Sequence, residues 1–116
     1  MSVTIYGIKT CDTVKKARTW LETHGKAYAF HDYRVEGIDR AHLDAWADKV
    51  GWEVLLNKTS TTFRALSEGD KQGIDRAKAI DLMLAEPTMI KRPVLDLGNG
   101  KLLVGFKPDS YAAAMA

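Results

Sequence analysis

The sequence predicts an α/β domain with a mixed four-stranded sheet and helices packed against it. Three observations support this fold class. Strand-like and helix-like hydrophobic patterns alternate at the N-terminus, which predicts a parallel strand pair. Gly-Asn-Gly at residues 98–100 joins two later strand-like segments, which predicts an antiparallel pair. The stretch between them is helical in pattern. Since 116 residues fit one domain, we expect a single domain over residues 1–116, with a helical insertion at about 37–87.

The N-terminal part predicts a βαβ unit. In order, we expect a strand at residues 3–6, a loop at 7–10, a helix at 12–24 and a strand at 27–33. Val14, Ala17 and Leu21 share one face of the helix at helical spacing, and Gly25 supplies its C-terminal stop.

The middle part predicts helices only. Asp39 caps a helix that ends at Gly51, and its apolar residues follow helical spacing: Leu43, Trp46, Ala47 and Val50. Short helical pieces are expected over residues 52–73, with Ser60 or Thr61 as a cap. A helix follows at 75–85, stopped by Pro87, and three of its residues are expected to face inward: Ala77, Ile80 and Leu84.

The last part predicts strands at residues 94–97 and 102–106 and a helix at 108–114, with Pro108 in its first turn. The whole order is strand–helix–strand, helices, strand–strand–helix. A thioredoxin-like fold has this order, with extra helices inserted at its middle.

Composition excludes several classes of protein. A net charge of +2 is too small to indicate nucleic-acid binding, and no apolar stretch approaches the ~18 residues of a membrane span. The N-terminus lacks a basic segment followed by a long apolar run, so we expect no signal peptide. A single cysteine excludes an internal disulfide. We expect a cytoplasmic monomer without metal or tightly bound cofactor.

Cys11 is the candidate nucleophile. It lies where a loop gives way to a helix, and the N–H groups and partial positive charge there stabilise a thiolate. Lys9 and Lys15 add positive potential. The alternative is a small buried hydrophobe, but the polar neighbours of Cys11 favour the reactive interpretation. Because Val14 occupies the second position of a Cys-x-x-Cys pair, a cycle needs an external thiol such as glutathione or another protein.

The segment before the third strand, IKRPV at residues 90–94, carries a second candidate feature. The Arg92–Pro93 bond is a candidate for the cis form, which beside a thiol leaves backbone groups free to pair with an extended peptide. Arg92 offers a planar charged fork that suits an oxyanion or carboxylate. From spacing alone, a strand-initiating proline beside an exposed basic pair is the better interpretation.

Three motifs together resemble the arsenate reductase (ArsC) family, and most closely its YffB/Spx-like subgroup. They are TIYGxxxC at residues 4–11, PxxIKRPV at 87–94 and GFKP at 105–108. The likeness covers nearly the whole chain. It implies a thioredoxin-like fold and a reactive cysteine that maps to Cys11.

In arsenate reductases of this family, three arginines hold the oxyanion. The first maps to Arg92, the second meets the neutral Asn57 beside Lys58, and the third is replaced by Lys107. Lysine keeps the charge but not the bidentate fork. Arg64 is a further candidate, equally well explained as a surface arginine. The residues expected to bind substrate or glutathione are therefore Lys9, Thr10, Asp12, Thr13, Arg92, Pro93 and Lys107.

The resemblance implies a glutathione-dependent thiol reductase that works through a mixed disulfide, with glutathione as co-substrate. Its substrate is an oxidised thiol or an oxyanion, and glutaredoxin is a further expected partner. Two alternatives stay open. One is arsenate reduction itself, and the other is an Spx-like regulator that binds RNA polymerase, although Val14 removes the Cys-x-x-Cys switch that many such regulators carry.

Overall fold

The computed structural model describes residues 3–115, and its chain divides into two compact units. One unit comprises residues 1–36 and 92–116, and the other comprises residues 37–91. Residues 1, 2 and 116 of the expected domain lie outside the described residues. Each unit is considered by itself below. Within residues 3–115, no helix combines the length and the apolar character needed to cross a membrane.

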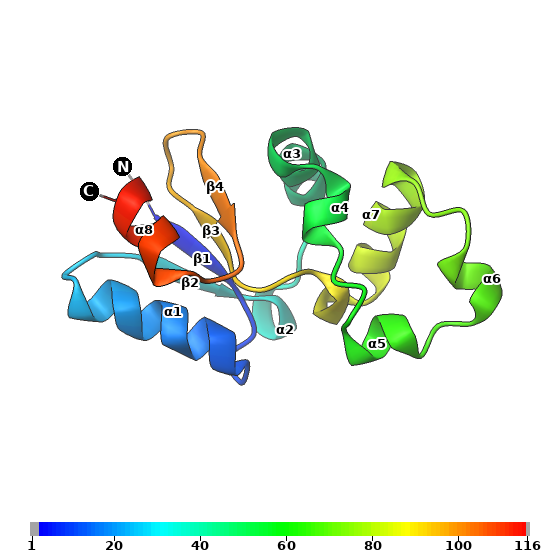
Figure 1. Ribbon diagram of the computed structural model, residues 1–116, viewed down its shortest axis with the longest axis horizontal. Helices are drawn as coiled ribbons and strands as arrows, with labels where there is room; N and C mark the ends of the chain where they lie inside the picture. Colours follow the sequence, from blue (N-terminus) through cyan, green and yellow to red (C-terminus); the bar gives the residue numbers. More distant parts are fainter. Residues whose placement is uncertain (1–2, 116) are drawn as a thin grey trace. The chain divides into compact units, whose positions relative to one another are not determined.

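The first unit is a four-stranded mixed sheet with helices, as the sequence predicted (Figure 1). The strand order is β2-β1-β3-β4; β1 pairs in parallel with β2, and antiparallel pairs join β1 to β3 and β3 to β4. Its elements are β1 (Thr4–Gly7), α1 (Asp12–Thr23), β2 (Ala29–Asp32), α2 (Tyr33–Glu36), β3 (Val94–Asp96), β4 (Leu102–Val104) and α8 (Pro108–Ala114). The sheet is the mixed one expected for a thioredoxin-like fold.

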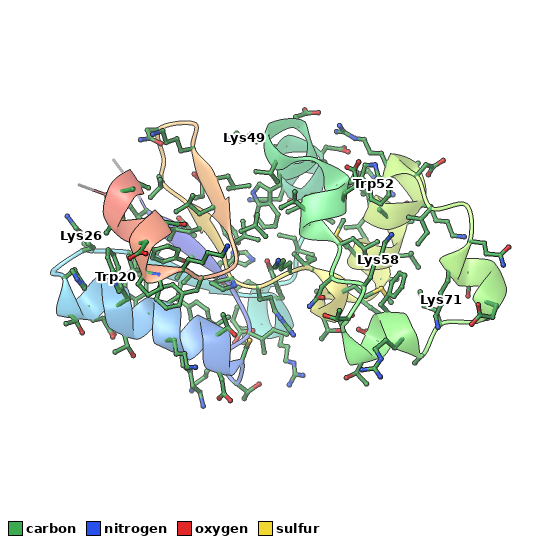
Figure 2. All side chains as sticks on the ribbon, in the orientation of Figure 1. Trp20, Lys26, Lys49, Trp52, Lys58 and Lys71 are labelled. Carbon is green, nitrogen blue, oxygen red and sulfur yellow. The ribbon has the colours of Figure 1, made fainter. Side chains whose placement is uncertain are left out.

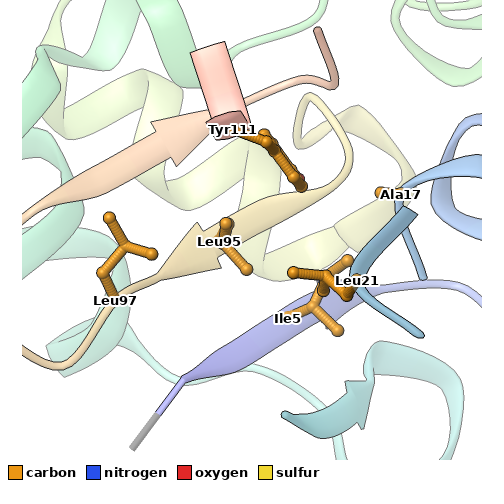
Figure 3. Packing of buried hydrophobic residues seen from close by; sticks show 6 residues of the cluster. All are labelled: Ile5, Ala17, Leu21, Leu95, Leu97 and Tyr111. Atoms are coloured by element: carbon orange, nitrogen blue, oxygen red, sulfur yellow. The ribbon is translucent and has the colours of Figure 1, made fainter. Parts of the chain in front are cut away.

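The apolar stripe of α1 builds the core of this unit. Ala17 and Leu21 are fully buried against Ile5 of β1 and Leu95 of β3 (Figure 3). Tyr111 of α8 joins the same cluster, and its ring meets those of Trp20 and Phe106 edge-on, at centroid distances of 5.5 and 4.8 Å. Periodicity alone thus located the buried face of α1, because a single stripe at 3.6-residue spacing has only one way to face a sheet.

The second unit is entirely helical apart from one isolated bridge between Leu56 and Ile90. It consists of α3 (Arg40–Val50), α4 (Trp52–Leu55), α5 (Thr61–Arg64), α6 (Glu68–Lys71), α7 (Arg76–Ala85) and the 3₁₀ turn η1 (Pro87–Met89). The predicted caps are confirmed: the side chains of Asp39 and Ser60 accept N–H groups of His42 and Phe63. Gly51 ends α3 with φ 89°, in the region that glycine tolerates best.

Three details of the prediction are wrong. The second strand ends at Asp32, and Tyr33 opens the short helix α2 instead. The last strand ends at Val104, because Gly105 at φ 81° turns the chain. Ala77 is exposed and Leu84 only half-buried, since α7 buries a different face: Ala79, Ile80 and Met83. Periodicity could not choose between these faces of an apolar helix, because the choice depends on where α3 packs.

The hydroxyl of Tyr111 lowers the stability of the core of the first unit. Its side chain is fully buried, and its hydroxyl has no hydrogen-bond partner among the described residues. Burial also raises the pKa of Tyr111 above the usual value of 10. An unpaired buried hydroxyl is destabilising, so we expect Tyr111→Phe to raise the free energy of unfolding by about 1 kcal/mol at pH 7.

This advantage of Tyr111→Phe should grow in alkali. Burial gives Tyr111 a higher pKa in the folded protein than in the unfolded chain. Below pH 10 both states keep the proton, and the free energy of unfolding of the wild type does not depend on this group. Above pH 10 only the unfolded chain releases the proton, so the free energy of unfolding of the wild type falls as the pH rises. The difference between variant and wild type should widen by up to ~1.4 kcal/mol per pH unit above 10. Urea unfolding at pH 7, 10 and 11 measures it, and a constant difference across this range would contradict the prediction.

Candidate functional site

The sheet topology brings three separate segments to one edge. β1 and β2 are parallel, and their last residues, Gly7 and Asp32, are register partners. β3 is antiparallel to β1, so its first residue, Val94, pairs with Tyr6 near the same end. Residues that follow Gly7, that follow Asp32 and that precede Val94 therefore meet at this edge. We call it the Cys11 edge and define it as residues 8–13, 32–34 and 92–93.

Hydrogen bonds of its backbone hold Cys11 in place, and its side chain is not used for capping the helix. Its N–H donates to the carbonyl of Ile8 at 3.1 Å, and its carbonyl accepts the N–H of Lys15 at 3.0 Å in the first turn of α1. It is the N-cap residue of this 12-residue helix, with extended backbone angles, yet its side chain makes no capping hydrogen bond. Cys11 is a partly exposed residue. The N-cap position lies at the N-terminus of the helix, where negative charge is favoured.

Asp32 is a site residue that the sequence analysis missed. Its side chain is buried, with 8% of its surface exposed. One carboxylate oxygen accepts the N–H of Lys9 at 3.2 Å, and the other accepts the N–H of Arg34 at 2.8 Å. Asp32 therefore ties the turn that carries Cys11 to the end of β2. The sequence did contain a signal for this role. An aspartate at the end of a strand can accept the N–H of the residue two positions later, where a helix begins.

Asp32→Ala is expected to loosen this turn. Hydrogen bonds to charged groups contribute ~1.5–3 kcal/mol, so the variant should lose stability of that order and its Cys11 should react more slowly with iodoacetamide at pH 7. Asp96→Ala is the matched control, because Asp96 accepts the N–H of Gly98 in the β3–β4 turn in the same way. The control should lose stability but keep the alkylation rate. Equal alkylation rates in both variants would contradict a positioning role for Asp32.

The Arg92–Pro93 bond is cis, and Pro93 is buried whereas Arg92 is partly exposed. The carbonyl of Pro93 accepts the N–H of Gly105 at 2.8 Å, which fixes the chain after β4 beside it. Lys107 follows two residues later as the exposed N-cap residue of α8. The fold thus gathers Cys11, Arg92 and Lys107 at one end of the sheet, although they are scattered along the sequence.

The other residues considered for binding in the sequence analysis divide into two sets. Four lie on the turn and first turn of α1 that carry Cys11, and all are exposed: Lys9, Thr10, Asp12 and Thr13. Asn57, Lys58 and Arg64 belong instead to the helical unit, where Figure 2 labels Lys58. The geometry described for the Cys11 edge involves only the first unit.

Tyr33 is a second residue that the sequence analysis did not select. It is 4% exposed, and its hydroxyl has no hydrogen-bond partner among residues 3–115. Burial raises the pKa of Tyr33 far above its ordinary value, the positive charge of Arg92 acts in the opposite direction, and Tyr6 adds to the rise. The Tyr33 hydroxyl is consequently neutral at pH 7.

The described part of the chain holds no group of three or more His, Cys, Asp or Glu side chains arranged to bind a metal ion. The Cys11 edge offers a partly exposed cysteine together with the positive charges of Lys9 and Arg92. Such a sulfur can attack a disulfide or another electrophile, and the cations can hold an anionic reactant near it.

Comparison with known proteins is consistent with this geometry. The sequence model of the ArsC family matches residues 6–114. An uncharacterised protein of Haemophilus influenzae is 47% identical over 114 residues, which are 98% of this chain and 99% of that protein.

Two solved structures extend the comparison. A protein named YFFB is 61% identical and superimposes with a TM-score of 0.95, covering 99% of this chain and all of the other. A protein of Brucella melitensis described as related to arsenate reductase (ArsC) is 58% identical, with a TM-score of 0.79 and coverage of 99% and 95%.

Proposed function

The chain belongs to the ArsC family, and from this membership and the geometry at Cys11 we propose that it is a glutathione-dependent thiol reductase. The observation that carries the proposal is the position of Cys11, a partly exposed residue, as the N-cap of α1, with a side chain that makes no capping hydrogen bond. A thiolate in that position is stabilised by the helix and remains available to attack.

The proposed cycle has two thiol–disulfide exchanges. The Cys11 thiolate attacks the glutathione sulfur of a glutathionylated substrate; the new sulfur–sulfur bond forms as the old one breaks, and the substrate leaves as a thiolate that takes a proton from water. A glutathione thiolate then attacks the mixed disulfide on Cys11 and releases oxidised glutathione. Two electrons pass to the substrate, and Cys11 returns to its thiolate.

The surroundings of Cys11 support a single-thiol cycle. The sequence contains one cysteine, so the mixed disulfide must be resolved by a second molecule of thiol. Glutathione carries carboxylates, and Arg92 and Lys107 supply positive charges at this end of the sheet, with Lys9 in the turn before Cys11. We propose that these side chains bind the carboxylates. Arginine can do so through two parallel hydrogen bonds, whereas lysine acts as a point charge.

The proposal is tested by incubating the protein with oxidised glutathione at pH 7 and following the intact mass. We expect one glutathionyl group per chain, removed again by excess reduced glutathione. The same chain unfolded in urea is the matched control, because it presents the same thiol without the helix. The folded protein should react about 10-fold faster, since the helix N-terminus and the neighbouring cations stabilise negative charge on the attacking sulfur. Reaction no faster than in urea would refute the proposal.

A further inference from the structure

We propose that the hydroxyl of Tyr33 and the guanidinium of Arg92 together bind one carboxylate of the thiol co-substrate at the Cys11 edge. The inference rests on the proposed function and adds to it a binding residue and the ligand group that this residue recognises. It comes from the placement of Tyr33, from the state of its hydroxyl and from a contrast with Tyr111.

Placement brings the two residues to the same end of β1. Tyr33 directly follows Asp32, the register partner of Gly7. Arg92 lies two residues before Val94, the register partner of Tyr6. The two side chains thus come from opposite neighbours of β1, at the edge where the chain continues through the turn 8–11 to Cys11.

The Tyr33 hydroxyl is a buried donor without an acceptor. The side chain is 4% exposed, and no described residue forms a hydrogen bond with its oxygen. Leaving such a group unpaired is costly, so a buried hydroxyl at a site calls for a ligand atom. The high pKa that burial gives Tyr33 keeps it protonated, so that it offers an O–H.

The positive charge of Arg92 favours an anion as the acceptor for the Tyr33 hydroxyl. Strand pairing brings Arg92 and Tyr33 to the same end of β1, and the positive charge of Arg92 opposes the rise in the pKa of Tyr33. A guanidinium has only donors, and the protonated hydroxyl offers a donor beside it. Two donors call for two acceptor positions on the ligand, and a carboxylate supplies them with its two oxygens.

Tyr111 shows that a buried hydroxyl alone does not make such a site. It is also fully buried and without a hydrogen-bond partner in the described chain, but burial is the only cause of its raised pKa. Its ring packs among aliphatic and aromatic side chains of the core. Among the described residues, no charge contributes to the raised pKa of Tyr111, so Tyr111 is a matched control for Tyr33.

The test compares two disulfide probes on the intact chain. Oxidised glutathione carries carboxylates, and 2-hydroxyethyl disulfide carries none. The rate of mixed-disulfide formation at Cys11 is measured with each, for wild type, Tyr33→Phe, Arg92→Gln, the double variant and Tyr111→Phe. We expect Tyr33→Phe to slow the reaction with oxidised glutathione about 10-fold, the loss of one hydrogen bond to a charged group. The reaction with 2-hydroxyethyl disulfide should be unchanged.

The double variant tests whether the two groups share one carboxylate. If they do, Tyr33→Phe costs less than 3-fold once Arg92→Gln is present, because residues that act on one ligand group are not additive. Tyr111→Phe should match wild type with both probes. Equal slowing with both probes, or none, overturns the assignment of Tyr33 while adduct formation upholds the proposed function. No adduct with either probe in wild type overturns both.

Discussion

Cys11→Ser is expected to abolish adduct formation with oxidised glutathione completely while leaving the protein folded. The chain has no other cysteine to take over the reaction, and a serine hydroxyl does not ionise at neutral pH. The loss should therefore extend to every turnover that passes through a mixed disulfide. Intact mass and a glutathione-dependent turnover assay measure it.

Folding should not explain this loss. Cys11 is the N-cap residue of α1 but makes no capping hydrogen bond, whereas serine is a preferred N-cap residue. Cys11→Ser should accordingly gain up to ~1 kcal/mol in unfolding free energy, and Cys11→Ala, which cannot cap, should not. Both variants should be equally inactive. Turnover that survives in either of them would mean that Cys11 is not the nucleophile.

Gly7→Ala is expected to destabilise the first unit by ~1–3 kcal/mol, because the added carbon overpacks the core. A Cβ at position 7 would lie 2.6 Å from Cγ2 of Val14, which is fully buried in α1. Valine has one strongly preferred rotamer in a helix, so it cannot turn away. The helix itself must move, and with it the turn that carries Cys11. Urea unfolding and the rate of reaction with oxidised glutathione both report the change.

Two further variants isolate the clash. In the double variant Gly7→Ala, Val14→Ala the contact is gone, so the combined cost should not exceed that of Val14→Ala alone. Gly69→Ala is the control, because a Cβ there meets nothing within 4 Å and its φ is not positive. That control should gain ~0.5–1 kcal/mol, as expected for alanine in a helix. Equal losses in Gly7→Ala and Gly69→Ala would contradict the overpacking.

The sequence could predict features that depend on near neighbours along the chain. Asp39 and Ser60 were recognisable as caps, since a capping side chain bonds to an N–H only three residues away. The buried face of α1 was predictable from the spacing of Val14, Ala17 and Leu21. The inward face of α7 was not, because an apolar helix offers more than one candidate face and the neighbouring helix selects it.

By itself, the sequence determined the fold class and the identity of the single thiol at a helix start, because periodicity, caps and turn residues act over a few positions. Only the tertiary structure decided which groups surround that thiol. Asp32 reaches Lys9 across 23 positions of sequence, and Tyr33 comes under the charge of Arg92, because strand pairing places them at one end of β1. Hydrogen bonds and charge act through space, so these partners became visible only once the sheet had brought them together.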